Sequence, residues 1–156
     1  MTDRSIYIGF DPREAAAFAV ARHSIRRHMS RDIEINGLVL KDLKAMGLFT
    51  RPQEHRGGQL WDLISDAPCS TEFSLTRFLI KELAGSGWAL FMDCDMLVRA
   101  DIHELFDLFD DSKAVMCVKH DHDPAETSKM GGIVQSRYHR KNWSSLVMWN
   151  AGHPSN

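Results

Sequence analysis

The chain has 156 residues, of which 44% are hydrophobic and 26% charged, so it is long enough to bury one core without disulfides or structural metals. Its 19 basic and 21 acidic residues are interspersed, which argues against nucleic-acid binding and against a charged tail. No apolar run is long enough to span a bilayer, and the N-terminus has no signal-type segment. Cys69, Cys94 and Cys117 lack any Cys-x-x-Cys spacing, so we expect reduced thiols in a soluble cytoplasmic protein.

The first part of the chain predicts a strand, a helix and a second strand. Residues 5–10 form a short β-rich apolar run, and Asp11 and Glu14 then provide the two halves of a capping box. Apolar residues recur at helical spacing over 18–29, and residues 33–40 read as the second strand. This β-α-β order favours an α/β fold with a mainly parallel sheet and helices on both faces.

The rest of the chain continues the alternation of helices and strands. A continuous apolar run such as 88–92 is typical of a central strand that is covered on both faces. The expected elements are a short helix over 43–48, a loop over 51–58, a helix from 70 or 71 to about 83 ended by Gly85, a strand over 88–92, a helix from Asp101 to 108, and strands over 114–118 and 145–149.

Asp93 and Asp95 directly follow the predicted central strand. Strand geometry would put both carboxylates on one side and Cys94 on the other. Ligands of open α/β sheets bind outside the carboxyl ends of strands, and paired carboxylates suit Mg²⁺ or Mn²⁺ holding a diphosphate. The alternative is that the two aspartates only cap the turn that ends the strand.

The block over 88–108 resembles the metal-binding region of GT-A glycosyltransferases, most closely the retaining glycosyltransferase family 8 and its bacterial relatives. The apolar strand, the Asp-x-Asp, a hydrophobic triplet and the Asp-x-x-Glu-Leu-Phe helix follow in the same order. The resemblance implies a Rossmann-like GT-A fold and a single nucleotide-sugar-binding domain over 1–156 that lacks the family's C-terminal portion. It also implies that Asp93 and Asp95 hold Mn²⁺ or Mg²⁺.

Three further segments are similar to the same family. Residues 6–11 resemble its first strand, whose terminal Asp lies beside the nucleotide base, and residues 74–78 resemble a segment whose Arg contacts the donor. Residues 143–150 resemble a later strand that borders the donor sugar and the acceptor. The resemblance therefore implies donor-binding roles for Phe10, Asp11, Arg77 and Cys94, and sugar-side or acceptor-side roles for Asn142, Ser144 and Ser145.

Two departures from the family pattern concern the same region and the metal. The usual Asn-Ser/Ala-Gly on the later strand is replaced by Trp143-Ser144-Ser145, with Asn142 one position early. The histidine that completes the family's metal shell near its C-terminus has no counterpart after Asn156. The sequence predicts no catalytic base.

The resemblance implies a metal-dependent transferase that moves a sugar, with retention, from a UDP-linked donor to an unknown acceptor. Two alternatives remain open. A phosphatase of the haloacid dehalogenase type also places Asp-x-Asp after an apolar strand, although Leu97 stands where it usually has Thr or Val. The chain could instead bind a nucleotide without turnover.

Overall fold

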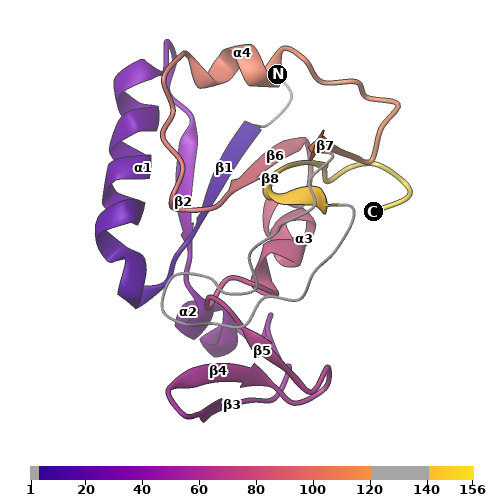
Figure 1. Ribbon diagram of the computed structural model, residues 1–156. Coiled ribbons are helices and arrows are strands. Elements are labelled where there is room, and N and C mark those ends of the chain that lie inside the picture. The colour runs from indigo at the N-terminus through magenta and orange to yellow at the C-terminus, as the bar shows by residue number, and fades with distance from the viewer. Residues whose placement is uncertain (1–3, 121–140) are drawn as a thin grey trace.

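A five-stranded sheet forms the centre of the computed structural model, which describes residues 4–120 and 141–156 (Figure 1). Its strand order is β2-β1-β6-β8-β7. A separate antiparallel sheet has the order β3-β4-β5. The strands of the large sheet are β1 (Arg4–Gly9), β2 (Glu34–Leu38), β6 (Trp88–Met92), β7 (Val115–His120) and β8 (Lys141–Asn150).

Strand β6 lies in the middle of the large sheet, and all five of its residues are buried. This confirms the prediction of a central strand over 88–92. β6 is parallel to β1, with Met92 opposite Ile8, and antiparallel to β8, with Met92 opposite Leu146.

The sheet is mixed, which corrects the expectation of a mainly parallel Rossmann-like sheet. β1, β2 and β6 run in one direction, but β8 is antiparallel to both of its neighbours, β6 and β7. β8 follows β7 in the chain and pairs with it directly, and antiparallel neighbours can be joined at a single end of the sheet without a crossover.

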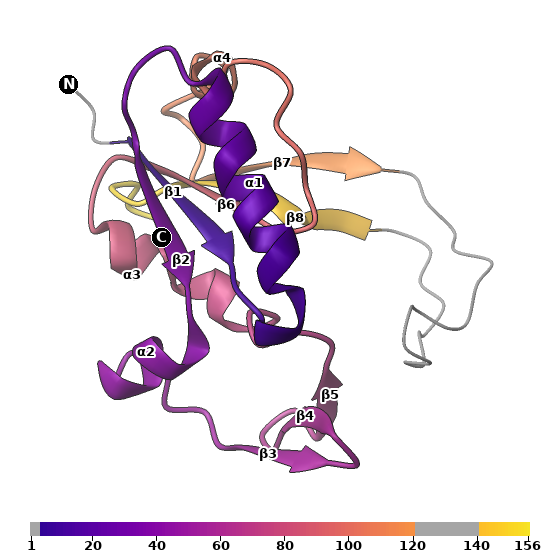
Figure 2. The ribbon, with the colours of Figure 1, turned by 90° about the vertical axis from the view of Figure 1, so that its left-hand side faces the viewer.

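Helices cover both faces of the large sheet, as expected. In Figure 2, α1 (Ala15–His28) lies in front of the sheet and α3 (Ile80–Ala84) behind it. α1 buries Ala21 and Ile25 and is preceded by the 3₁₀ turn η1 (Pro12–Glu14), whose first N–H groups include the Arg13 amide bonded by the Asp11 carboxylate at 2.9 Å. Asp11 is therefore the N-terminal cap that the sequence predicts.

The predicted loop over 51–58 is wrong, because this region contains strands of the small sheet. β3 (Gln53–Arg56) and β4 (Gln59–Asp62) form a hairpin, and β5 (Ala67–Cys69) pairs with β4. Gly57 and Gly58 both have positive φ, at 58° and 84°, which a two-residue hairpin turn of this kind requires. In Figure 2 the small sheet lies beyond the carboxyl ends of β1 and β2.

The predicted helix from 70 to about 83 is shorter than expected. A 3₁₀ turn, η2 (Thr76–Leu79), leads into α3, and Gly85 ends α3 with φ of 66° as predicted. Two more short helices are α2 (Leu40–Ala45) and α4 (Ile102–Phe106), the second capped by Asp101. Within the described residues, no helix combines the length and the apolarity needed to cross a membrane.

Candidate functional site

Asp93 and Asp95 lie at the carboxyl end of the buried strand β6. β6 itself ends at Met92, and the Asp93 amide still donates to the Ser145 carbonyl of β8 at 2.8 Å, while Cys94 and Asp95 form a turn. Strand alternation therefore does not extend through Asp95. The side chains nevertheless differ in burial as alternation would suggest, because Cys94 is 1% exposed and Asp95 is exposed.

Arg77 approaches Asp93 from η2. Its Nη1 lies 3.1 Å from Asp93 Oδ1, and the same atom donates to the carbonyl and the hydroxyl oxygen of Ser144 at 2.7 and 3.2 Å. Arg77 Nε donates to the Phe73 carbonyl at 3.3 Å. Its guanidinium also lies over the rings of Phe73 and Phe91, at 5.4 and 5.0 Å from their centroids. This one side chain therefore joins η2, the end of β6 and β8.

The expectation that the Arg77 head emerges at the rim of the sheet is wrong. The side chain is 11% exposed, and its guanidinium is directed at protein acceptors and aromatic rings. Burial lowers the pKa of Arg77, while Asp93 and Asp95 act in the opposite direction. Both carboxylates thus lie in the field of one buried cation, which reduces the repulsion between them.

Asp11 lies after β1, the strand next to β6, and its carboxylate is fully engaged by the protein. It accepts hydrogen bonds from the Arg13 amide, from Arg13 Nε and Nη2 at 3.0 and 2.8 Å, and from the Glu72 amide at 3.0 Å. Burial alone would raise the pKa of Asp11, but these hydrogen bonds outweigh it and lower the pKa. The structure thus gives Asp11 a structural role, and its predicted contact with a nucleotide base stays a prediction.

Cys94 is a packing residue in this structure. Its Sγ donates to Glu14 Oε2 at 3.2 Å, and burial together with Glu14 raises the pKa of the thiol to about 12. A thiol with this pKa stays protonated at neutral pH and is a poor nucleophile. Phe10 is half-buried and packs edge-to-face on Phe18, with ring centroids 5.2 Å apart. The Glu14 contact was missed by the sequence reasoning, which assigned Glu14 to a capping box.

The structure brings Ser144 and Ser145 next to Asp93 on the neighbouring strand. Ser144 contacts Arg77 through its carbonyl and hydroxyl, and Ser145 accepts the Asp93 amide through its carbonyl. Asn142 lies on the same strand in register with Lys119, but its side chain is outside the described part of the structure. The predicted roles of these three residues toward a sugar or an acceptor stay predictions.

Among residues 4–120 and 141–156, no three or more His, Cys, Asp or Glu side chains gather in a way that could hold a metal ion. The two predicted ligands, Asp93 and Asp95, thus stand as a pair. Two pockets in the described part of the chain, of about 350 and 260 Å³, are lined by other residues. The predicted cleft at Asp93 and Asp95 remains a prediction.

The architecture defines an α/β domain with a mixed sheet that is similar to a glycosyltransferase structure. The solved structure is that of WbbM, a bifunctional glycosyltransferase in the apo form, with a TM-score of 0.55 at 14% identity over 97% of this chain and 32% of that chain. At this identity the likeness shows the fold alone.

By sequence, the chain is similar to Protein CDI of Arabidopsis thaliana, at 49% identity over 152 residues. The match covers 97% of this chain and 54% of Protein CDI, so the chain spans about half the length of this curated relative. No protein-family model matches the chain.

Proposed function

We propose that this domain binds a nucleotide-diphosphate sugar, UDP-linked, through a divalent cation held by Asp93 and Asp95, and that it transfers the sugar with retention to an acceptor. The observation that carries the proposal is the position of the Asp-x-Asp. It follows the buried central strand of a mixed α/β sheet similar to that of a glycosyltransferase.

The two carboxylates fit the proposed cation in their donor chemistry. Mg²⁺ is usually bound by one or two carboxylates together with substrate phosphates and waters, so a pair of aspartates is a sufficient protein contribution. Asp95 is exposed and has its oxygens available to solvent. Asp93 is held in position by Arg77 and by the bond from its amide to Ser145. When bound, Mn²⁺ or Mg²⁺ would offset the negative charge of the diphosphate.

The neighbouring residues then divide into positioning and contacting groups. Arg77 orients Asp93 and adds a fixed positive charge near the diphosphate, although its own bonds are to the protein. Cys94 and Asp11 hold the turn after β6 and the end of β1 in position. Ser144 and Ser145 border the sugar side on β8.

The likeness to a glycosyltransferase structure supports a transferase over a phosphatase. In the dehalogenase-type phosphatases the Asp-x-Asp follows the first strand, whereas here it follows β6.

The test compares Asp95→Asn with Asp32→Asn in a thermal-shift titration with UDP and Mn²⁺. Both aspartates are exposed, but Asp32 lies just before β2, at the amino end of the parallel strands, away from Asp95. Ligand at about 100 times its dissociation constant stabilises a domain by about 2.7 kcal/mol, which raises Tm by several degrees. We expect this gain in wild type and Asp32→Asn and its loss in Asp95→Asn. Equal gains in all three proteins would contradict the proposed metal site.

A further inference from the structure

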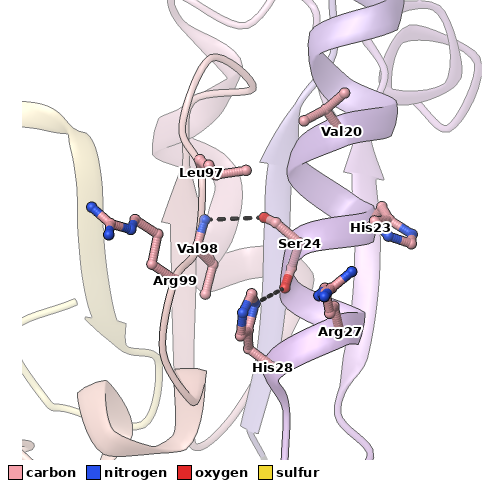
Figure 3. A pocket seen from close by; sticks show the side chains of 8 residues that line it. All are labelled: Val20, His23, Ser24, Arg27, His28, Leu97, Val98 and Arg99. Atoms are coloured by element: carbon pink, nitrogen blue, oxygen red, sulfur yellow. Dashed lines mark hydrogen bonds between the residues drawn. The ribbon is translucent and has the colours of Figure 1, made fainter.

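A pocket of about 350 Å³ lies on the α1 face of the large sheet, away from the carboxyl end of β6. Figure 3 shows that one wall is the second half of α1 and that the other is the segment over 97–99, which returns from Asp95 toward α4. Neither Asp93 nor Asp95 lines it.

The two walls are fixed to each other by a buried hydrogen bond. The Val98 amide donates to Ser24 Oγ at 3.0 Å, and the Ser24 hydroxyl donates to the Ala21 carbonyl at 2.7 Å. Ser24 is 4% exposed, so water competes little for these bonds. The pocket is therefore preformed, which lowers the entropic cost of binding a ligand.

The two ends of the pocket differ in chemistry. Val20 and Leu97 lie at one end in Figure 3, and they are exposed by 56% and 62%. Arg27 and His28 lie at the other end. His28 Nδ1 donates to the Ser24 carbonyl at 2.9 Å, which fixes the ring and leaves Nε2 for another partner.

The charge of this wall is of one sign. α1 contains three arginines, two histidines and no acidic residue, and no acidic residue lines the pocket. Within the described residues, no carboxylate forms an ion pair with Arg27. The helix dipole accounts for cations in the last turn of α1, including Arg26, but it does not account for two exposed apolar side chains beside them.

We propose that this pocket binds a small organic anion, with an apolar body of about one aromatic ring and a phosphate or carboxylate at one end. A benzene ring occupies a cavity of about 150 Å³, so the pocket has room for the ring and for the anionic group. The body packs between Val20 and Leu97. The anion accepts hydrogen bonds from the Arg27 guanidinium, whose planar fork suits phosphate and carboxylate oxygens.

The test is an NMR titration of the full chain with phenyl phosphate, inorganic phosphate and phenol, each up to about 20 mM, because a ligand of this size binds in the millimolar range. We expect saturable amide shifts confined to residues 20–28 and 97–99, with phenyl phosphate tighter than either fragment. Arg27→Gln should weaken phenyl phosphate by about twofold to fivefold, whereas Arg26→Gln, one residue away and outside the pocket, should leave it unchanged. Leu97→Asn should weaken it by about fourfold, the factor for burying one methylene group.

Three results would overturn the proposal. Phenyl phosphate that binds no better than inorganic phosphate would remove the apolar end, and equal binding of phenol would remove the anionic end. Equal losses in Arg27→Gln and Arg26→Gln would show only the general positive charge of α1. The titration contains no nucleotide and no metal, so its result is independent of the function proposed for Asp93 and Asp95.

Discussion

Arg77→Lys tests whether the buried guanidinium holds the end of β6 to β8 and η2. The change keeps the positive charge but replaces a planar fork of donors with a single ammonium group. In the native protein the guanidinium bonds to acceptors on three elements, the Phe73 carbonyl on one side and Ser144 and Asp93 on the other. An ammonium cannot reach both sides at once, so at least one of these bonds is lost.

The expected magnitude follows from the number of bonds and their burial. A lost hydrogen bond costs about 1 kcal/mol, and one that involves a charged group costs about 1.5–3 kcal/mol, so Arg77→Lys should lower the free energy of unfolding by about 1–3 kcal/mol. Arg77→Met should cost about 3–5 kcal/mol, because it also leaves the largely buried Asp93 carboxylate without its cation.

Urea denaturation measures both losses, and Tm should fall by about 2–4 °C for each kcal/mol. Arg26→Lys on the exposed side of α1 is the matched control and should change the free energy by less than about 0.5 kcal/mol. An Arg77→Lys protein as stable as this control would refute the reasoning, since the contacts of the guanidinium would then contribute nothing that an ammonium does not.

Three more predictions follow from buried groups near the same end of the sheet. Gly9→Ala should lower the free energy of unfolding by about 1–3 kcal/mol, because the added methyl would lie 2.5 Å from the Phe73 ring, and a loss below about 0.5 kcal/mol in urea would contradict this packing. The lowered pKa of Asp11 stabilises the fold above the unfolded pKa of about 3.9, and this contribution is lost as the pH falls through the folded pKa. Wild type should therefore lose more stability than Asp11→Asn between about pH 5 and pH 2, and parallel curves would rule this out. At about pH 8, iodoacetamide should label the half-buried Cys117 well before Cys94, whose pKa is raised to about 12, and equal rates would exclude the buried thiol.

Local signals predicted the elements that frame the candidate site. The continuous apolar run over 88–92 can be satisfied only by a strand covered on both faces, and β6 has these bounds and is fully buried. Asp11 before Pro12 defines the start of a helix through the geometry of its own backbone and side chain, so its capping role could be predicted without the fold.

The features that were missed depend on contacts between distant parts of the chain. The direction of β8 is set by its pairing with β6 and β7, which its own apolar pattern does not encode. Arg77 and Ser144 are 67 residues apart in the chain, so the burial of the guanidinium could not be predicted from helical spacing. The β3–β4 hairpin is short and largely polar, and its best signal was the Gly57-Gly58 pair.

Isothermal titration calorimetry of UDP binding, once with Mn²⁺ and once with a chelator, tests the central claim most directly. Asp93 and Asp95 face a diphosphate as two negative charges, and only one buried arginine lies beside them to compensate. We therefore expect UDP to bind at least about tenfold more tightly with Mn²⁺ than with the chelator, a difference of about 1.4 kcal/mol. Equal affinity under the two conditions would contradict a metal-bridged nucleotide site at the end of β6.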